Sequence, residues 1–205
     1  MSAADPELDR ATILLLAGGK ATRLPHKLTL PVEGLPMLVR VFRRLTATGR
    51  SCVISAREPL AADLAAQLPA NVVLDRHDDA GPLAGIAAGA AAVQTRVVFV
   101  AAADLPNIDA AFVDDLEAAY RELDAAGAAP DALVPTWPDG RREPLAALYA
   151  TRPLARAAAA TLAAGDKKVT AAFDHLRVAA YPVRPHDEEK LINVNTSADY
   201  EAARR

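Results

Sequence analysis

The sequence contains a single cysteine, Cys52, so it has neither an internal disulfide framework nor a zinc site built from cysteines. Cys52 stands in the apolar run Cys52-Val53-Ile54, which predicts a buried core thiol. No metal-ligand spacing links the four histidines, which are His26, His77, His175 and His186. We also find no pairing of a nucleophile with a base of the kind that acyl-enzyme chemistry requires.

Long apolar runs and basic stripes are also missing. No uncharged apolar stretch reaches the ~20 residues that a membrane-spanning helix needs. Met1 to Arg10 lacks the basic start and the apolar run of a signal peptide. Aromatic residues make up only 4% of the chain and the formal net charge is −3, which argues against general nucleic-acid binding. We therefore predict a cytoplasmic protein that binds neither membrane nor nucleic acid.

Short apolar runs alternate with amphipathic or Ala-rich segments along the first 130 residues. Strands are predicted at Thr12–Leu16, Cys52–Ser55, Val72–Leu74 and Val97–Ala101. Helices are predicted at Pro36–Thr48, Pro59–Leu68, Leu83–Val93 and Ile108–Ala126. This alternation predicts an α/β fold, doubly wound, with a mostly parallel sheet and helices on both faces.

After Pro130 the rhythm changes. Two strands, Ala132–Pro135 and Leu145–Tyr149, are predicted on either side of a polar turn. A helix over Pro153–Ala164, a strand over Arg177–Val183 and a terminal helix complete the chain. The length of 205 residues suits one domain with a sizeable core, so we predict a single domain over residues 1–205.

The first predicted strand ends at Leu16 and runs directly into Ala17-Gly18-Gly19. In open α/β sheets, ligands bind beyond the carboxyl ends of the strands. Glycines let backbone N–H groups approach phosphate oxygens closely, and Arg23 and Lys27 supply positive charge where a triphosphate would lie. The spacing is neither a Walker A loop nor a dinucleotide fingerprint, and a Gly-Gly pair alone is also a common turn.

Two other strand ends carry candidate ligands. Asp104 follows the fourth strand, where a hard carboxylate can hold Mg²⁺ against phosphate oxygens. The alternative is a cap for the next helix, for which Asp109 is better placed. The segment Gly81-Pro82-Leu83-Ala84-Gly85-Ile86 follows the third strand, although Pro82 at a first helical position is also common for structural reasons.

Polar residues near the C-terminus form a third group. Asn193 and Asn195 occupy alternate positions, which point the same way in an extended chain, and amides can serve a phosphate, a ribose or a metal-bound water. Thr196 and Asp199 predict a capping box at the start of the last helix. The pair Lys167-Lys168 suits a phosphate, but lysines at a helix end also serve simply as solvated residues.

These motifs together resemble a known family. Leu15-Leu16-Ala17-Gly18-Gly19, Arg23, Lys27 and Gly34-Leu35-Pro36-Met37-Leu38 resemble the N-terminal signature of nucleotidyltransferases that act on sugar phosphates and molybdopterin. The match is best with the molybdenum cofactor guanylyltransferase family. Later matches in the same order are Gly81 to Ile86, Glu143-Pro144, Lys167-Lys168 and Asn193 to Thr196. One segment departs from the family, Leu24-Pro25-His26, where a glycine and an acidic residue are usual.

The resemblance implies a Rossmann-like nucleotidyltransferase fold in which residues 1–130 bind the NTP and residues 131–205 bind the acceptor. The implied nucleotide-binding residues are Leu16, Ala17, Gly18, Gly19, Lys27, Asp75, Gly81, Pro82, Gly85 and Asp104. The implied catalytic residues are Arg23, Lys27 and Asp104, with Asp104 as the metal ligand. The implied acceptor-binding residues are Lys167, Lys168, Asn193 and Asn195. Asp75 can accept from N1–H and N2–H₂ of guanine, which offers a basis for base choice.

The reaction that the resemblance implies is Mg²⁺-dependent transfer of GMP from GTP to molybdenum-molybdopterin, which yields molybdopterin guanine dinucleotide and pyrophosphate. Molybdoenzyme apoproteins or a molybdate-insertion protein are implied as further partners. Two alternatives stay open: a related enzyme that uses CTP on molybdopterin or an NTP on a sugar phosphate, and a non-catalytic nucleotide-binding regulatory module. The Leu-Ala-Gly-Gly start favours GTP, because the CTP-using relatives tend toward Ala-Ala-Gly.

Overall fold

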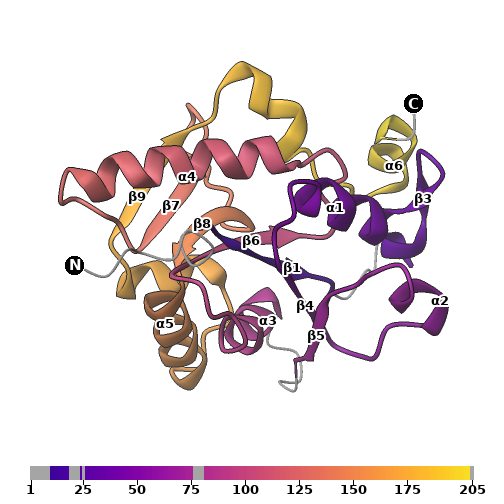
Figure 1. Cartoon of the computed structure of the whole chain (residues 1–205), viewed down its shortest axis with the longest axis horizontal. Helices are drawn as coiled ribbons and strands as arrows, with labels where there is room; N and C mark the ends of the chain where they lie inside the picture. The colour runs from indigo at the N-terminus through magenta and orange to yellow at the C-terminus, as the bar shows by residue number, and fades with distance from the viewer. Residues whose placement is uncertain (1–9, 19–23, 25, 76–80, 204–205) are drawn as a thin grey trace.

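The computed structural model describes residues 10–18, 24, 26–75 and 81–203. Within these residues the main sheet has seven strands in the order β5-β4-β1-β6-β8-β7-β9 (Figure 1). They are β1 (Thr12–Leu16), β4 (Cys52–Ala56), β5 (Asn71–Leu74), β6 (Val97–Ala102), β7 (Ala132–Thr136), β8 (Ala146–Ala150) and β9 (Val178–Pro182). β8 runs antiparallel to both neighbours and the other pairs are parallel, so the predicted mostly parallel sheet is confirmed.

Helices cover both faces of this sheet. They are α1 (Met37–Thr46), α2 (Ala62–Ala65), α3 (Gly81–Ala90), α4 (Ala110–Ala125), α5 (Thr151–Ala163) and α6 (Ser197–Ala203). α1 and α4 pack on one face, and α3 and α5 pack on the other (Figure 1). Ile13 and Leu15 face the first layer while Leu14 and Leu16 face the second, because side chains alternate along a strand. The doubly wound arrangement is therefore confirmed.

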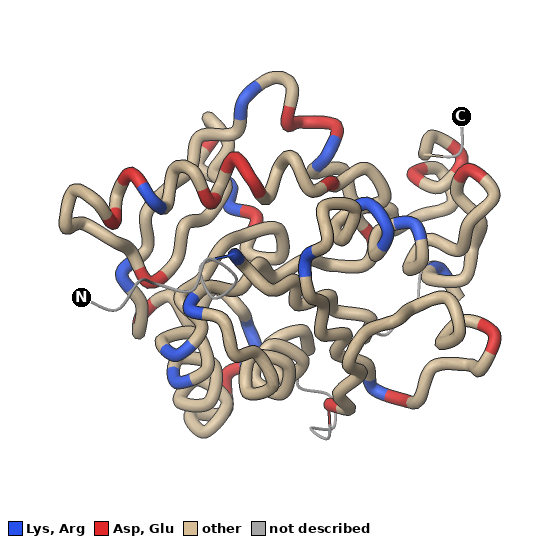
Figure 2. The backbone as a smooth tube through the Cα atoms, viewed as in Figure 1, with Lys and Arg blue, Asp and Glu red and all other residues tan. Residues whose placement is uncertain are grey.

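Charged side chains of both signs are mixed along the outer helices and loops (Figure 2). Some charged side chains are buried instead: the Arg50 side chain is fully buried and donates to Glu117 at 2.6 Å and to Asp114. Glu117 also accepts from the backbone N–H of Ala11, so this buried network fixes the start of β1 to α4. In the described part of the chain, no helix has the length and apolar character needed to cross a membrane.

A small hairpin that was not predicted precedes α1, and its last residue, Pro36, was predicted to be the first residue of the helix. Its strands are β2 (Pro31–Val32) and β3 (Leu35–Pro36), and α1 begins at Met37. The turn residues Glu33 and Gly34 have φ of 48° and 79°, the positive values that a two-residue hairpin turn requires. Strands of two residues are too short to show alternation, which explains why the sequence did not reveal them.

Helical structure differs from prediction in two further respects. The predicted helix Pro59–Leu68 is reduced to α2, whose N-cap residue Ala61 has no side chain to accept from the first turn. Three short 3₁₀ segments were not predicted: η1 (Lys27–Thr29), η2 (Val169–His175) and η3 (Pro185–Leu191). Segments this short lack the periodicity that identifies longer helices.

Cys52 is half-buried against the α1–α4 core rather than fully enclosed. Burial raises the pKa of its thiol to about 12. A thiol with that pKa carries almost no thiolate at neutral pH, so Cys52 is a packing residue and not a nucleophile.

Gly89 allows α3 to lie close to β1. A Cβ built at this position would lie 2.1 Å from Cδ1 of Leu14, which is fully buried. We expect Gly89→Ala to lower the free energy of unfolding by about 1–3 kcal/mol through overpacking. The gain in helix propensity, at most about 1 kcal/mol, offsets only part of this. Urea unfolding followed by circular dichroism measures the difference.

The double variant with Leu14→Ala provides the control. Leu14→Ala alone is expected to cost about 2–5 kcal/mol, because it leaves a cavity. If the clash is real, the double variant costs less than the sum of the two single changes. Additive costs, or a Gly89→Ala protein more stable than wild type, would contradict the close contact.

Candidate active site

Several chain segments meet at the edge of the sheet where β1 ends. β1 and β6 pair as far as Leu16 and Ala102. Because β8 is antiparallel, its beginning lies at this same edge, and the N–H of Ala102 donates to the carbonyl of Leu145 at 2.9 Å. The N–H of Val194 donates to the carbonyl of Asp104 at 2.8 Å, which brings in the C-terminal segment. Both halves of the chain therefore contribute to this edge.

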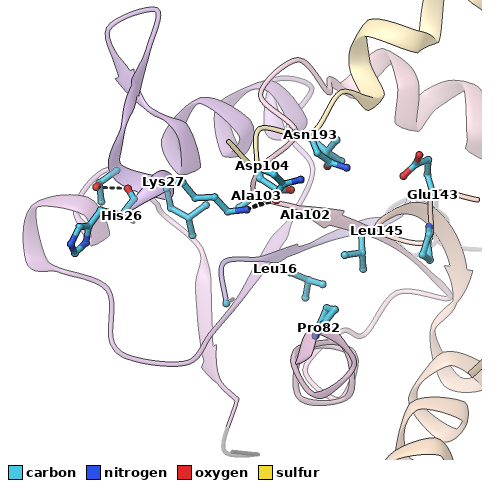
Figure 3. A pocket seen from close by; sticks show the side chains of 16 residues that line it. Leu16, His26, Lys27, Pro82, Ala102, Ala103, Asp104, Glu143, Leu145 and Asn193 are labelled. Atoms are coloured by element: carbon cyan, nitrogen blue, oxygen red, sulfur yellow. Dashed lines mark hydrogen bonds and ion pairs between the residues drawn. The ribbon is translucent and has the colours of Figure 1, made fainter. Parts of the chain in front are cut away.

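A cavity of about 570 Å³ opens there (Figure 3), a size typical of small-molecule sites. The first half of the chain contributes Leu16, Gly18, His26, Lys27, Leu28, Thr29, Pro82, Ala102, Ala103, Asp104 and Leu105. The second half contributes Glu143, Pro144, Leu145, Asn193 and Asn195. The walls are mostly apolar and carry a few converging polar groups, the usual character of a ligand pocket.

Lys27 connects the two halves across this cavity. Its Nζ donates to Oδ2 of Asp104 at 2.5 Å and to Oδ1 of Asn195 at 3.0 Å. The side chains of Lys27 and Asp104 are each 17% exposed, and they point toward one another in Figure 3. A shielded pair is screened less by salt than a surface pair, so these charges act strongly on any ligand that enters.

The segment that departs from the family carries Lys27 into place. Leu24 is buried in a small apolar cluster with Val32, Met37 and Val194. His26 has φ of 56°, in the left-handed region, and η1 starts directly after it. Lys27 is thus the first residue of η1, and it lies three residues after the buried Leu24. His26 itself lies exposed at the cavity wall.

The Asp104 side chain does not cap the next helix, α4. Asp109 caps α4, since its carboxylate accepts from the N–H of Phe112 at 3.0 Å, and the prediction that Asp109 is the cap is confirmed. Within the described residues, the Asp104 carboxylate has one hydrogen-bond donor, Lys27, and that bond uses Oδ2. Oδ1 is therefore open to a ligand in the cavity.

Asn193 and Asn195 line the cavity just before α6, and hydrogen bonds at the start of α6 fix this segment. Thr196 and Asp199 bond each other reciprocally: the N–H of Thr196 donates to the Asp199 carboxylate at 2.8 Å, and the N–H of Asp199 donates to Oγ1 of Thr196 at 3.2 Å. The predicted capping box is confirmed. Backbone N–H donation from Asn195 and Thr196 also lowers the pKa of Asp199 below its ordinary value. Asn193 and Asn195 are thereby held at the cavity.

Several predicted site residues lie outside the cavity wall. The N–H of Ala17 donates to the carbonyl of Ser55 at 2.8 Å, so this residue extends the pairing of β1 with β4. A Cβ at Gly85 would lie 3.1 Å from Oγ of Ser55, so the structure accounts for Gly85 by close packing of α3 on the sheet. Gly19 and Arg23 lie outside the described residues.

Four other predicted residues, Asp75, Gly81, Lys167 and Lys168, also lie outside the cavity wall. Asp75 follows β5, and its N–H donates to the carbonyl of Ala56 at 2.8 Å. Gly81 has φ of 64°, and a Cβ there would lie 3.5 Å from the carbonyl oxygen of Lys167. The Lys167 backbone thus lies close to Gly81, and the residue after Gly81, Pro82, lines the cavity. Both lysine side chains are exposed. The binding roles assigned to these residues stay predictions.

The structure adds an acidic side chain, Glu143, to the predicted residues of the cavity wall. The sequence showed only a Glu-Pro dipeptide before a strand, which did not separate a structural role from a functional one. Its position depends on the placement of β8 beside β6, a contact between distant parts of the chain. No local pattern carries that information.

Comparisons with known proteins agree with this geometry. The pattern that defines the MobA-like NTP transferase domain matches residues 13–179. A molybdenum cofactor guanylyltransferase of Burkholderia vietnamiensis is 36% identical, with 95% of each chain covered. The crystal structure of molybdopterin-guanine dinucleotide biosynthesis protein A from Archaeoglobus fulgidus superimposes with a TM-score of 0.77 at 26% identity, covering 94% of this chain and 96% of that one.

The fold is shared more widely. A cytidylyltransferase from Leptospira borgpetersenii superimposes with a TM-score of 0.71 at 17% identity, covering 95% of this chain and 85% of that one. Fold alone therefore leaves the choice of nucleotide open, whereas the matched pattern and the sequence relatives identify the family. The resemblance inferred from the motifs is confirmed, and the chain belongs to the MobA-like NTP transferase family, together with the molybdenum cofactor guanylyltransferases.

Proposed function

We propose that this protein transfers GMP from GTP to the terminal phosphate of molybdenum-molybdopterin, with Mg²⁺ at Asp104. The observation that carries the proposal is the contact of Lys27 with both Asp104 and Asn195 in the wall of one cavity. This places a cation, a carboxylate and an amide from both halves of the chain where two phosphate-bearing substrates could meet. The names of the sequence relatives supply the substrate class.

The proposed transfer of GMP requires stabilisation of charge on the phosphates and no proton transfer from a side chain. A phosphate oxygen of the acceptor forms a bond to the α-phosphorus of GTP, and the bond from that phosphorus to the bridging oxygen of pyrophosphate breaks. The attacking phosphate is already ionised, so no side chain has to act as a base. Lys27 neutralises charge on the triphosphate, and fixed donors such as the Asn195 amide orient the reacting groups.

The donor set at the cavity fits a magnesium ion. Mg²⁺ in phosphoryl-transfer sites is held by one or two carboxylates together with substrate phosphates, and it prefers hard oxygen ligands. Asp104 supplies such a carboxylate with Oδ1 open, and when bound the ion would supply positive charge to the phosphate oxygens. Asn193 and Asn195 offer amide oxygens nearby in the same wall.

A second group of potential metal ligands, Asp115, His186 and Asp187, suits this role less well. The Arg184 guanidinium already donates to the carboxylates of Asp115 at 2.5 Å and Asp187 at 2.8 Å. None of these residues lines the cavity of about 570 Å³. We interpret this group as an ion-pair network that holds η3 on α4.

Nucleotide choice is tested most directly by binding and turnover together. We expect calorimetry with Mg²⁺ to detect binding of GTP at least about 10-fold tighter than CTP or ATP, because a carboxylate such as Asp75 suits the N–H donors of guanine. We expect pyrophosphate release from GTP to require molybdopterin and to stop when EDTA removes the metal. The assay follows pyrophosphate and the dinucleotide product separately.

The alternatives predict different results. Tight CTP binding without GTP binding would overturn the guanylyl assignment in favour of a cytidylyl relative. GTP binding without pyrophosphate release in the presence of molybdopterin would indicate a nucleotide-binding regulatory module. Asp75→Ala should weaken selection for guanine while leaving Mg²⁺ dependence in place. Contacts with molybdoenzyme apoproteins or with a molybdate-insertion protein stay predictions beyond this assay.

A further inference from the structure

Glu143 lies on the far side of the cavity from Lys27 (Figure 3). Its segment is fixed by two backbone hydrogen bonds: the Glu143 N–H donates to the carbonyl of Pro135 at 2.9 Å, and the N–H of Ala146 donates to the Glu143 carbonyl at 3.2 Å. The side chain is 16% exposed. It is thus a carboxylate presented from a rigid frame at the start of β8.

The side chains of Trp137 and Arg141 also orient the Glu143 carboxylate. Nε1 of Trp137 donates to Oε1 at 2.8 Å, and the Arg141 guanidinium lies 3.5 Å from the same oxygen. Arg141 stacks on the Trp137 ring at 4.3 Å, which steadies both partners. Among the described residues these are the side-chain partners of Glu143, and both use Oε1. Oε2 therefore has open acceptor capacity in the cavity wall.

The order of the strands gives the cavity two sides, one at β1 and β4 and the other at β8. Asp104 follows β6 and Gly18 follows β1, and α3 starts after β5, which lies beyond β1 and β4 in the sheet. Glu143 lies on the opposite side, at β8. If the two phosphates meet at Asp104, a nucleotide over β1 and β4 leaves the β8 side to the acceptor. A carboxylate repels phosphate, so Glu143 suits a neutral part of the acceptor that carries N–H donors.

We propose that Glu143 is a specificity residue that accepts hydrogen bonds from the 2-amino-4-oxo edge of the acceptor's pterin ring. That edge presents an N–H beside an NH₂ group, and the lone pairs of Oε2 can accept from these neighbouring donors. Pro144 and Leu145 supply apolar surface beside it for a flat heterocycle. The inference rests on the proposed function. Guanine carries the same donor edge, so the test must separate the two rings.

The test compares Glu143→Gln with wild type in the steady-state transfer assay. The amide replaces one acceptor oxygen by a donor that opposes the N–H of the ring, so we expect the KM for molybdopterin to rise about 10- to 100-fold. The KM for GTP and the Mg²⁺ requirement should change less than about 2-fold. Trp137→Phe removes the donor to Oε1 and retains an aromatic side chain, and it should raise the KM for molybdopterin by a smaller factor.

Glu122→Gln, an exposed change on α4, provides the matched control and should leave every parameter unchanged. A rise in the KM for GTP instead would assign the carboxylate to guanine and overturn the proposal. A changed Mg²⁺ dependence would make Glu143 a metal ligand and overturn it as well, as would unchanged kinetics. Direct binding of molybdopterin, followed by pterin fluorescence, should weaken by the same factor.

The two proposals can fail separately. If wild-type protein binds molybdopterin but forms no dinucleotide from GTP, the proposed reaction fails while Glu143→Gln still tests pterin recognition through the fluorescence readout. If wild-type protein forms the dinucleotide and Glu143→Gln binds molybdopterin as tightly, only the Glu143 assignment fails. Thermal unfolding of each variant shows whether its fold is intact.

Discussion

Asp104→Asn is expected to reduce kcat/KM for GMP transfer by about 1,000-fold, the loss typical of removing a group that stabilises transition-state charge. The change replaces a carboxylate by an amide of the same shape. The backbone of Asp104 still accepts from the N–H of Val194, so the surrounding segment should keep its position. The effect should therefore lie in the chemistry and not in folding, and thermal unfolding checks this.

Binding experiments give this variant a signature of its own. In wild type, Mg²⁺ should strengthen GTP binding, because an ion held by Asp104 would supply positive charge to the phosphates. In Asp104→Asn, GTP should bind with an affinity that hardly depends on Mg²⁺. Without metal the variant should bind GTP at least as well as wild type, since it has lost a negative charge beside the triphosphate.

Asp109→Asn is the matched control for this change. Asp109 lies five residues further along the same segment, and its carboxylate caps α4. Asparagine is also a good N-cap, so the variant should unfold at nearly the wild-type temperature and keep full transfer activity. Wild-type turnover by Asp104→Asn, or an equal loss in both variants, would remove Asp104 from the metal site.

The ends of the central strands predict part of the site from the sequence alone. The runs Thr12–Leu16 and Val97–Ala101 are buried on both faces in the structure, and an uninterrupted apolar run is the pattern of such central strands. Once these strands are parallel neighbours, the residues after them, Gly18 and Asp104, must meet at one edge. Local pattern and simple topology are enough for this half.

Lys27 and Glu143 need information that the sequence does not carry locally. The contact of Lys27 with Asp104 joins residues 77 apart, and it depends on the left-handed backbone of His26 and the anchored Leu24. Glu143 reaches the cavity only because β8 inserts between β6 and β7. Positive φ at a residue other than glycine and long-range strand order both arise from tertiary packing.

Lys27→Met is expected to reduce kcat/KM by about 100-fold and to weaken GTP binding by at least about 10-fold. The lysine is the cation closest to Asp104 among the described residues, and removing it deletes the charge that faces a triphosphate. Methionine keeps most of the side-chain volume, so packing against the cavity wall is largely retained. Calorimetry with GTP and the transfer assay measure the two effects.

Lys190→Met offers a matched control within the same chain. Its side chain is 19% exposed, against 17% for Lys27, and its Nζ also lies near two aspartates, each at 3.6 Å. It does not line the cavity. Loss of a shielded lysine–aspartate pair is therefore common to both variants, whereas loss of transfer should occur only in Lys27→Met. An equal loss of activity in both would mean that stability, and not catalysis, explains the effect.

The double variant Lys27→Met with Asp104→Asn decides whether the two residues act together. Groups that stabilise one transition state as a unit give losses that do not add, because the second change removes what the first has already disabled. We expect the double variant to lose little more than the roughly 1,000-fold expected for Asp104→Asn alone. A loss near the product of the two single effects, about 100,000-fold, would show that Lys27 and Asp104 contribute independently despite their direct hydrogen bond.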